Sequence, residues 1–156
     1  MNALAPDNYC ASPILSERIA ALLARDTYVT GLAVRLVAVS PGQAELAMEV
    51  APALTNVHGA CHGGALFTLA DLAFGSAAIY GGPVLTTGAD FNFVRTAPMG
   101  TIVRATASEL SRTAKTGLFQ VKLWKESTGV RAIGTFRGLW TRAAPGDGEP
   151  SLARRR

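Results

Sequence analysis

The stretch from residue 56 to residue 80, NVHGACHGGALFTLADLAFGSAAIY, constrains the fold more than any other part of the chain. Most residues after Gly64 are apolar and no polar stripe recurs at helical spacing, so a helix over 63–80 is predicted to be buried all round. Asp71 is its only charged residue. A carboxylate in apolar surroundings is costly unless it has a partner or a chemical role. The stretch therefore predicts a central helix that carries one functional acid.

The residues that lead into this helix are His62, Gly63 and Gly64. The first N–H groups of a helix have no partner within it, and the helix dipole is positive at the same end. Together they can bind a negatively charged group. A donor-rich helix start and one buried acid indicate half of an active site.

Composition and charge limit the class of protein to which this chain can belong. The chain has 156 residues, 49% of them hydrophobic, which is enough for one domain with a sizeable core. The formal net charge is +4, and the terminal arginines 154–156 supply +3 of it, which leaves +1 for the rest. This near-neutral balance argues against nucleic acid as a partner.

No membrane partner is expected, because Asp71, Gly75 and Ser76 interrupt the longest apolar run. The first residues lack the basic and apolar regions of a signal peptide, so a cytoplasmic protein is expected. The two cysteines, Cys10 and Cys61, are far apart and give no sign of a disulfide framework.

The remaining elements are predicted from periodicity and turn signals. We expect a short amphipathic helix that begins at Ser12-Pro13 and ends near Arg25. Six strands are expected, over residues 30–39, 43–51, 84–94, 101–110, 118–126 and 130–141. Short connections favour neighbouring antiparallel strands, and one such sheet would have to curl around the central helix to bury it. The sequence thus predicts an α+β fold with an N-terminal segment over 1–29, a folded domain over 30–142 and a disordered basic tail over 143–156.

The motif Asn56-x-x-Gly59-x-x-His62-Gly63-Gly64, followed by Leu69-Ala70-Asp71, resembles the signature of the hotdog-fold thioesterases. In pattern it is most similar to the phenylacetic-acid-degradation (PaaI-like) subfamily. The resemblance extends over about 30–141 and includes three further segments: Ser40-Pro41-Gly42, Asp90-Phe91-Asn92-Phe93-Val94-Arg95 and Phe136-Arg137-Gly138. It implies a hotdog fold, in which a curled antiparallel sheet wraps around a long central helix. It also implies an acyl-CoA thioesterase that needs no cofactor apart from the coenzyme A of its substrate.

The chemistry of thioester hydrolysis gives the motif residues distinct roles. The carbonyl oxygen becomes negative, and the N–H of Gly63 at the helix start is a natural donor to it. Asp71 is the only ionisable residue in the helix that could attack the carbonyl or activate water, and the sequence leaves both routes open. The resemblance implies that Asn56 orients the water or the thioester. It implies that His62 holds the loop or helps to set the Gly63 amide.

Further residues are candidates for contact with the substrate. The family has a Ser or Thr near the start of the strand after the helix; here the aligned position is Gly88, with Thr86 and Thr87 beside it. The acyl pocket is expected to use Gly64 and several apolar residues: Leu66, Phe67, Ala70, Phe91 and Phe93. Three cations are candidates for the phosphates of coenzyme A, since Arg and Lys suit that anion: Arg95, Arg112 and Lys115.

The spacing within the helix predicts an oligomer. Asp71 lies eight residues after Gly63, about 12 Å along an α-helix, so one thioester cannot touch both residues of one helix. Two central helices antiparallel across a two-fold axis would place each helix start opposite the partner's acid. A homodimer with shared active sites is therefore expected, and the resemblance implies that such dimers often pair into tetramers.

Other interpretations of the same residues stay open. His58, Cys61 and His62 with Asp71 could hold a metal, but two of them are adjacent and no second cluster exists, so no metal is expected. Cys61 near a helix start could be a nucleophile with a lowered pKa. The alternative functions are a non-catalytic acyl-CoA binding or sensor protein and a hotdog-fold hydratase or dehydratase. The acyl group, and coenzyme A against an acyl carrier protein, are not specified by the sequence.

Overall fold

The computed structural model describes residues 13–128 and 131–144, so the predicted Ser12 cap and most of the predicted tail lie outside the described residues. The helices are α1 (Pro13–Arg25), α2 (Thr27–Thr30) and α3 (Gly63–Ala78), with short 3-10 turns at η2 (Pro52–Leu54), η3 (Ile79–Gly81) and η4 (Glu126–Thr128). The strands are β1 (Arg35–Ser40), β2 (Gln43–Glu49), β3 (Val84–Phe93), β4 (Ile102–Arg112), β5 (Thr116–Lys125) and β6 (Ala132–Arg142).

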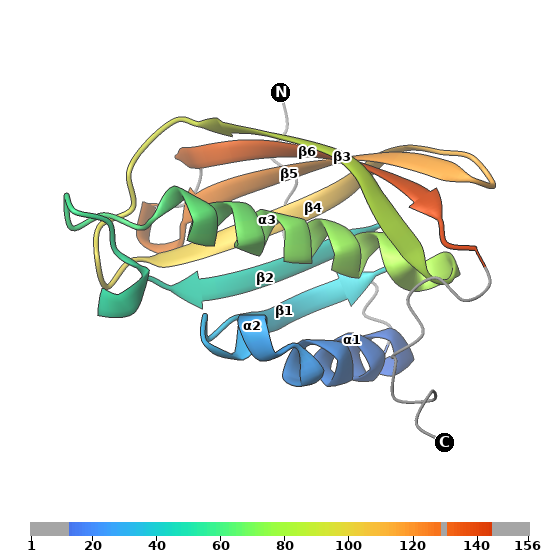
Figure 1. Ribbon diagram of the computed structural model, residues 1–156, viewed down its shortest axis with the longest axis horizontal. Coiled ribbons are helices and arrows are strands. Elements are labelled where there is room, and N and C mark those ends of the chain that lie inside the picture. The colour runs from blue at the N-terminus through green and yellow to red at the C-terminus, as the bar shows by residue number, and fades with distance from the viewer. Residues whose placement is uncertain (1–12, 129–130, 145–156) are drawn as a thin grey trace, which may run out of the picture.

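The six strands form one antiparallel sheet in the order β1-β2-β4-β5-β6-β3, which curls around α3 (Figure 1). The small helices α1 and α2 lie beside β1 at one edge, while β3 forms the other edge and passes over the C-terminal end of α3. The predicted α+β fold, a curled sheet around a long central helix, is confirmed.

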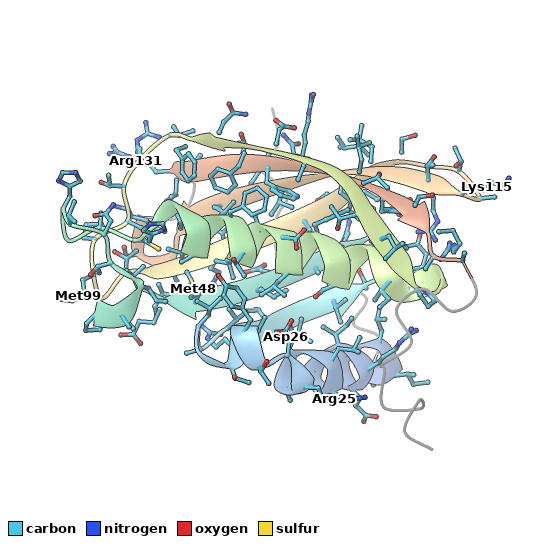
Figure 2. All side chains as sticks on the ribbon, in the orientation of Figure 1. Arg25, Asp26, Met48, Met99, Lys115 and Arg131 are labelled. Carbon is cyan, nitrogen blue, oxygen red and sulfur yellow. The ribbon has the colours of Figure 1, made fainter. Side chains whose placement is uncertain are left out.

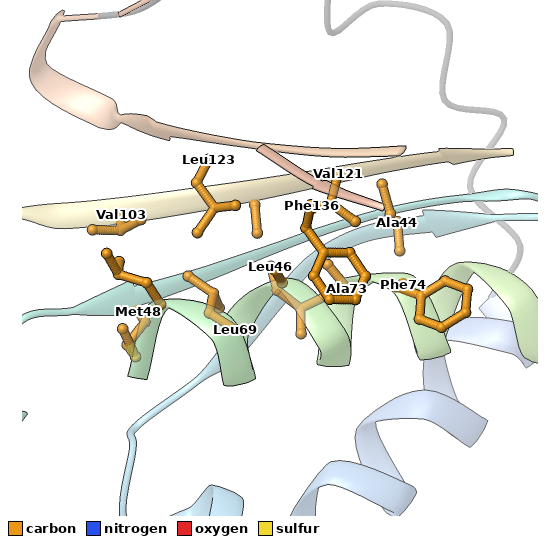
Figure 3. Packing of buried hydrophobic residues seen from close by; sticks show 14 of the residues in the cluster. Ala44, Leu46, Met48, Leu69, Ala73, Phe74, Val103, Val121, Leu123 and Phe136 are labelled. Carbon is orange, nitrogen blue, oxygen red and sulfur yellow. The ribbon is translucent and has the colours of Figure 1, made fainter. Parts of the chain in front are cut away.

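The core lies between the concave face of the sheet and α3 (Figure 3). Alternate residues of β2, β4 and β5 point into it and are at most 1% exposed: Ala44, Leu46, Met48, Val103, Ala105, Ala107, Phe119, Val121 and Leu123. The ring of Phe74 on α3 lies against Gly138 of β6, where a Cβ would be only 2.8 Å from that ring. Because each fully buried Leu, Met, Val or Phe side chain contributes roughly 1.5–3 kcal/mol, this interface is the main source of stability.

The predicted strand over 30–39 is wrong at its beginning. The carboxylate of Asp26 accepts hydrogen bonds from the N–H groups of Tyr28 and Val29, at 3.0 and 3.2 Å, and so caps the short helix α2. Ala33 then has a positive φ of 48°, and the strand begins at Arg35.

The turn predicted over 112–117 is shorter than expected. Strand β4 continues to Arg112 and β5 begins at Thr116, because Arg112 pairs with Gly117 across the two strands. The turn residue Thr113 fixes this hairpin, since its hydroxyl accepts a hydrogen bond from the Thr116 N–H at 2.9 Å.

The prediction that α3 is buried all round is wrong for the single chain. Six residues along one side of the helix are partly or fully exposed: Gly64, Phe67, Thr68, Asp71, Leu72 and Gly75. We call this the uncovered side of α3. The sheet covers the remaining sides, so the helix Gly63–Gly81, which by length and composition alone could span a membrane, is a core helix of this fold.

Candidate active site

The loop before α3 is built around the side chain of Asn56. Its Oδ1 accepts hydrogen bonds from the N–H groups of His58 at 2.9 Å and Ala60 at 3.3 Å. The backbone N–H of Asn56 also donates to the Ala60 carbonyl at 2.7 Å. Gly59, with φ of +70°, makes the left-handed turn between them, a conformation that favours glycine. The described contacts of Asn56 therefore hold the loop in shape.

Two backbone hydrogen bonds tie the end of this loop to the rest of the domain. The N–H of Cys61 donates to the Ala97 carbonyl at 2.8 Å, and that of His62 donates to the Leu54 carbonyl at 2.7 Å. The two residues that precede α3 are therefore fixed by segments on either side of them, so the helix begins at a fixed position. A rigid start is what a preorganised hydrogen-bond donor requires.

His62 is the N-cap of α3 and leaves one amide of the helix start without a partner. Its Nδ1 accepts a hydrogen bond from the Gly64 N–H at 3.0 Å. Gly64 was expected to bind substrate, but its amide is thus occupied by the cap. Among the residues that the structure describes, no hydrogen bond uses the Gly63 N–H. The helix dipole and this amide together make Gly63 the better site for a negative oxygen.

An aromatic wall of three phenylalanines stands beside Gly63. A Cβ at Gly63 would lie 3.0 Å from the Phe93 ring. The Phe93 ring is 4.4 Å from that of Phe91, which is 6.1 Å from that of Phe67 on the uncovered side of α3. Phe91 in turn lies over Gly134, where a Cβ would be 2.7 Å from its ring. The three rings therefore form a continuous apolar surface beside the start of α3.

Asp71 is half-buried on the uncovered side of α3, and within 13–128 and 131–144 it has no hydrogen bond or ion pair. Burial raises the pKa of its carboxyl group above the usual value. The hydroxyl of Thr68, which could have capped the carboxylate, instead donates to the Gly64 carbonyl at 2.9 Å. An unsatisfied acid with a raised pKa is the form of carboxylate that functional sites use.

The alternative in which Cys61 is a nucleophile disagrees with the structure. Cys61 is buried, and burial raises the pKa of its thiol to about 11, so it stays protonated at neutral pH. In the described part of the chain, no three His, Cys, Asp or Glu side chains come close enough to hold a metal ion.

The predicted phosphate-binding cations lie at opposite ends of one subunit. Arg95 follows β3 near the start of α3, and its Nη1 donates to the Ala132 carbonyl at 3.1 Å. Arg112 lies at the other end, half-buried, with its guanidinium 4.2 Å from the Tyr80 ring centroid. Lys115 is in the turn beside it, whereas Met99 marks the end near the start of α3 (Figure 2). One chain therefore does not bring the three cations together.

The two threonines of β3 occupy different positions. A β-bulge between Thr86 and Gly88 leaves Thr87 out of register, and its hydroxyl donates weakly to the Leu139 carbonyl at 3.4 Å. Thr86 pairs with Trp140 of β6, close to Arg112 rather than to the helix start. No motif in the sequence marks Trp140 and Arg142 as candidate site residues, because only the strand register brings them to the end of α3.

Comparison with known proteins agrees with this geometry. Residues 58–132 match the family model described as the thioesterase superfamily. The chain is 28% identical over 119 residues to the acyl-coenzyme A thioesterase PaaI of Escherichia coli, over 76% of this chain and 84% of that protein.

Solved structures give the same result. The TT0310 protein of Thermus thermophilus is 30% identical, with a TM-score of 0.72 over 76% of this chain and 99% of that one. The E. coli PaaI protein is 26% identical, with a TM-score of 0.73 over 83% of this chain and 96% of that one. The chain therefore belongs to the PaaI-like hotdog-fold thioesterases, and it is a thioester hydrolase.

Proposed function

We propose that the protein hydrolyses an acyl-CoA to the free acid and coenzyme A, at an active site shared by two subunits. Gly63 of one subunit donates its N–H to the thioester carbonyl, and Asp71 of the partner subunit acts on the carbonyl carbon. The observation that carries this proposal is the pairing of an unused amide at the start of α3 with an unsatisfied acid on the uncovered side of the same helix.

Two features support a homodimer. The uncovered side of α3 exposes Phe67, at 37%, next to the half-buried Asp71. In the part of the chain that the structure describes, strand β3 pairs only with β6, so its other edge presents a row of backbone groups. Leu85 and Phe93 on this strand are 42% and 60% exposed. A long uncovered edge with apolar side chains is suited to pairing with a second chain. A two-fold axis near Phe67 would cover both features and set each Gly63 opposite the partner's Asp71.

The reaction can follow either of two routes with these groups. In the first, the Asp71 carboxylate takes a proton from water while the water oxygen bonds to the carbonyl carbon. The resulting oxyanion accepts the Gly63 hydrogen bond, the C–S bond then breaks, and the thiolate leaves and takes up a proton. In the second, Asp71 itself bonds to the carbon and expels the thiolate, and water hydrolyses the mixed anhydride. Both routes need an ionised Asp71 and the same donor.

Gly63 and Asp71 can each be tested by a matched pair of variants. Gly63→Pro removes the amide hydrogen, and proline is well tolerated at the first position of a helix. His62 already has φ −62° and ψ 138°, the extended conformation that a residue before proline prefers. Gly63→Ala adds a Cβ beside Phe93 but keeps the N–H, so the difference between the two variants measures the donor.

The experiment is free-thiol release from phenylacetyl-, hydroxybenzoyl-, hexanoyl- and lauroyl-CoA by wild type, Asp71→Asn, Gly63→Pro and Gly63→Ala. We expect wild type to hydrolyse at least one substrate and Asp71→Asn to lose roughly a hundredfold or more in kcat, the scale of a general base. Gly63→Pro should lose about a hundredfold relative to Gly63→Ala, the scale of one oxyanion donor. Wild type that binds these substrates without hydrolysing any would point instead to an acyl-CoA sensor.

A further inference from the structure

A row of residues crosses four strands at the end of the sheet next to the C-terminal end of α3. Arg112 of β4 pairs with Gly117 of β5, which pairs with Trp140 of β6. Trp140 pairs with Thr86 of β3, so the hydroxyl of Thr86 is on the same face as the indole. Gly117 has no side chain, and one there would overlap the Trp140 indole nitrogen. The Arg112 guanidinium therefore extends across Gly117 and lies 4.8 Å from the Trp140 ring centroid.

Two guanidinium groups converge on Gly81, the exposed residue that ends η3. The Nη1 of Arg142 donates to the Gly81 carbonyl at 2.7 Å, and its guanidinium carbon lies 5.1 Å from the Trp140 centroid. A Cβ on Gly81 would lie 3.2 Å from the Nη2 of Arg142 and would collide with the Nη2 of Arg112. Because position 81 is glycine, both Nη2 groups reach the same point at the surface.

The positive charge of this cluster is only partly neutralised by the described residues. The Nη1 of Arg112 pairs with the Glu109 carboxylate at 3.3 Å, and the same carboxylate oxygen accepts a hydrogen bond from Tyr80 at 3.1 Å. Across 13–128 and 131–144, Arg142 forms no ion pair, and no hydrogen bond uses its Nη2. One carboxylate beside two guanidinium groups leaves one positive charge and a planar set of donors, which suits a phosphate.

Along the helix, the cluster lies closer to Asp71 than to Gly63 of the same chain. Gly81 is ten residues after Asp71, about 15 Å along the helix, and eighteen residues after Gly63 of the same chain, about 27 Å. Gly75 lies between Asp71 and Gly81, and a Cβ there would meet no atom of the described chain within 4 Å. Gly75 thus leaves open space beside the helix between the acid and the two guanidinium groups.

We propose that Arg142 and Arg112, with Thr86 beside Trp140, bind a phosphate group of the carrier that holds the thioester. The carrier's arm then lies over Gly75, and its sulfur reaches the Asp71 of the same subunit. This inference rests on the proposed function, because it takes Asp71 as the group that acts on the thioester. It adds Arg142 and Trp140 to the site and gives Arg112 a partner for recognition of the anion.

Arg142 also supports the end of α3 through the Gly81 carbonyl, so the test must separate binding from stability. KM and kcat are measured for three thioesters of one acyl group: acyl-CoA, acyl-phosphopantetheine and acyl-pantetheine, the last of which has no phosphate. The variants are Arg142→Gln, Arg142→Lys and Arg137→Gln. Arg137 is an exposed residue of the same strand and has no role in the cluster, so its variant is the control for a lost charge. Thermal unfolding of each variant is followed in parallel.

We expect Arg142→Gln to raise KM for acyl-CoA by about tenfold to a hundredfold, the scale of a hydrogen bond to a charged group, with kcat unchanged. KM for acyl-pantetheine should not change. For acyl-CoA, the KM of Arg142→Lys should lie between those of Arg142→Gln and wild type, because lysine keeps the positive charge but lacks the planar, two-pronged set of donors of arginine. A KM increase for acyl-phosphopantetheine as well would identify the phosphate next to the arm. An increase confined to acyl-CoA would identify the phosphates of the nucleotide.

Three results would overturn the proposal. One is an equal KM increase for all three substrates in Arg142→Gln, and another is a lower unfolding temperature with no change in any KM; both would make Arg142 only a support of the helix end. The third is wild type with the same KM for acyl-CoA and acyl-pantetheine, which would leave the thioesterase function intact and remove the anchor. Absence of hydrolysis of every substrate by wild type would instead contradict the proposed function itself.

Discussion

Gly63 and Asp71 belong to the same helix, eight residues and about 12 Å apart, with the first at the helix start and the second on the uncovered side. The amide of Gly63 has no partner in the described chain, and neither has the carboxylate of Asp71. In the proposed mechanism each residue supplies one half of a thioesterase site, and the helix between them keeps the two halves of one chain apart. A second subunit in the proposed dimer would complete both sites at once.

The pH dependence of activity should report the environment of Asp71. Burial raises its pKa, and the reaction needs the ionised form, so kcat/KM should fall as pH drops through a value above the usual pKa of about 3.9 for aspartate. The measurement is kcat/KM as a function of pH, from below the ordinary aspartate pKa up to neutral pH. An acid limb at or below the ordinary aspartate value would contradict the assignment.

The same pKa shift predicts how Asp71→Asn changes stability. Because the folded-state pKa is raised above the unfolded one, the stabilising contribution of the protonated acid is complete below the unfolded pKa and is lost as pH rises through the folded pKa. Above that pH the ionised carboxylate opposes folding. Asp71→Asn should therefore unfold at a higher temperature than wild type at pH 7 while losing activity. A variant less stable than wild type at this pH would indicate a structural carboxylate instead.

Substitution of His62 separates capping from chemistry. His62→Ala removes the acceptor for the Gly64 N–H and should lower the free energy of unfolding by about 1 kcal/mol, with reduced activity as the helix start loosens. His62→Asn keeps a good N-cap acceptor and should retain most of the stability and activity. Urea unfolding and thiol release measure the two effects. A His62→Asn variant as stable as wild type but inactive would show that the imidazole takes part in the reaction.

Gly75 should respond differently to a small and a large substitution. A Cβ at this position meets nothing within 4 Å in the described chain, so Gly75→Ala should stabilise the helix by roughly 0.5–1 kcal/mol. Gly75→Leu would fill the strip of helix between Asp71 and Gly81, so it should raise KM for acyl-CoA. Equal KM for the two variants and wild type would mean that the carrier follows another route.

The sequence predicted the fold and the start of α3 more fully than it predicted the short helix α2 and the side of α3 that the sheet leaves uncovered. Alternation along β2 and glycine with proline after α3 are local signals, and both elements lie where they were expected. The short helix α2 was missed because its cap, Asp26, is followed by residues that also suit a strand. The uncovered side of α3 was missed because its polar positions are few, and only the order of the strands decides which side the sheet leaves open.

Some residues of the candidate site could be predicted from the sequence, and others could not. Gly63, Asp71 and His62 belong to one sequence motif and could be named as candidates from it, and their roles stay predictions. The cluster at Gly81 joins β4, β6 and η3, and it depends on the register that sets Arg112 opposite Gly117 and Gly117 opposite Trp140. No local pattern in the sequence encodes that register. Arg95 was grouped with Arg112 only because both are basic, and the fold separates them to opposite ends of the subunit.

The most direct test of the shared site is complementation between two inactive variants. Asp71→Asn and Gly63→Pro are purified separately, mixed in equal amounts, dissociated and reassociated, and assayed for thiol release. In a shared site, each mixed dimer contains one intact pair of Gly63 and Asp71, so random mixing should restore about a quarter of wild-type activity. If the mixture stays as inactive as its parents although mass measurement shows mixed dimers, the two residues do not act together across the subunit interface.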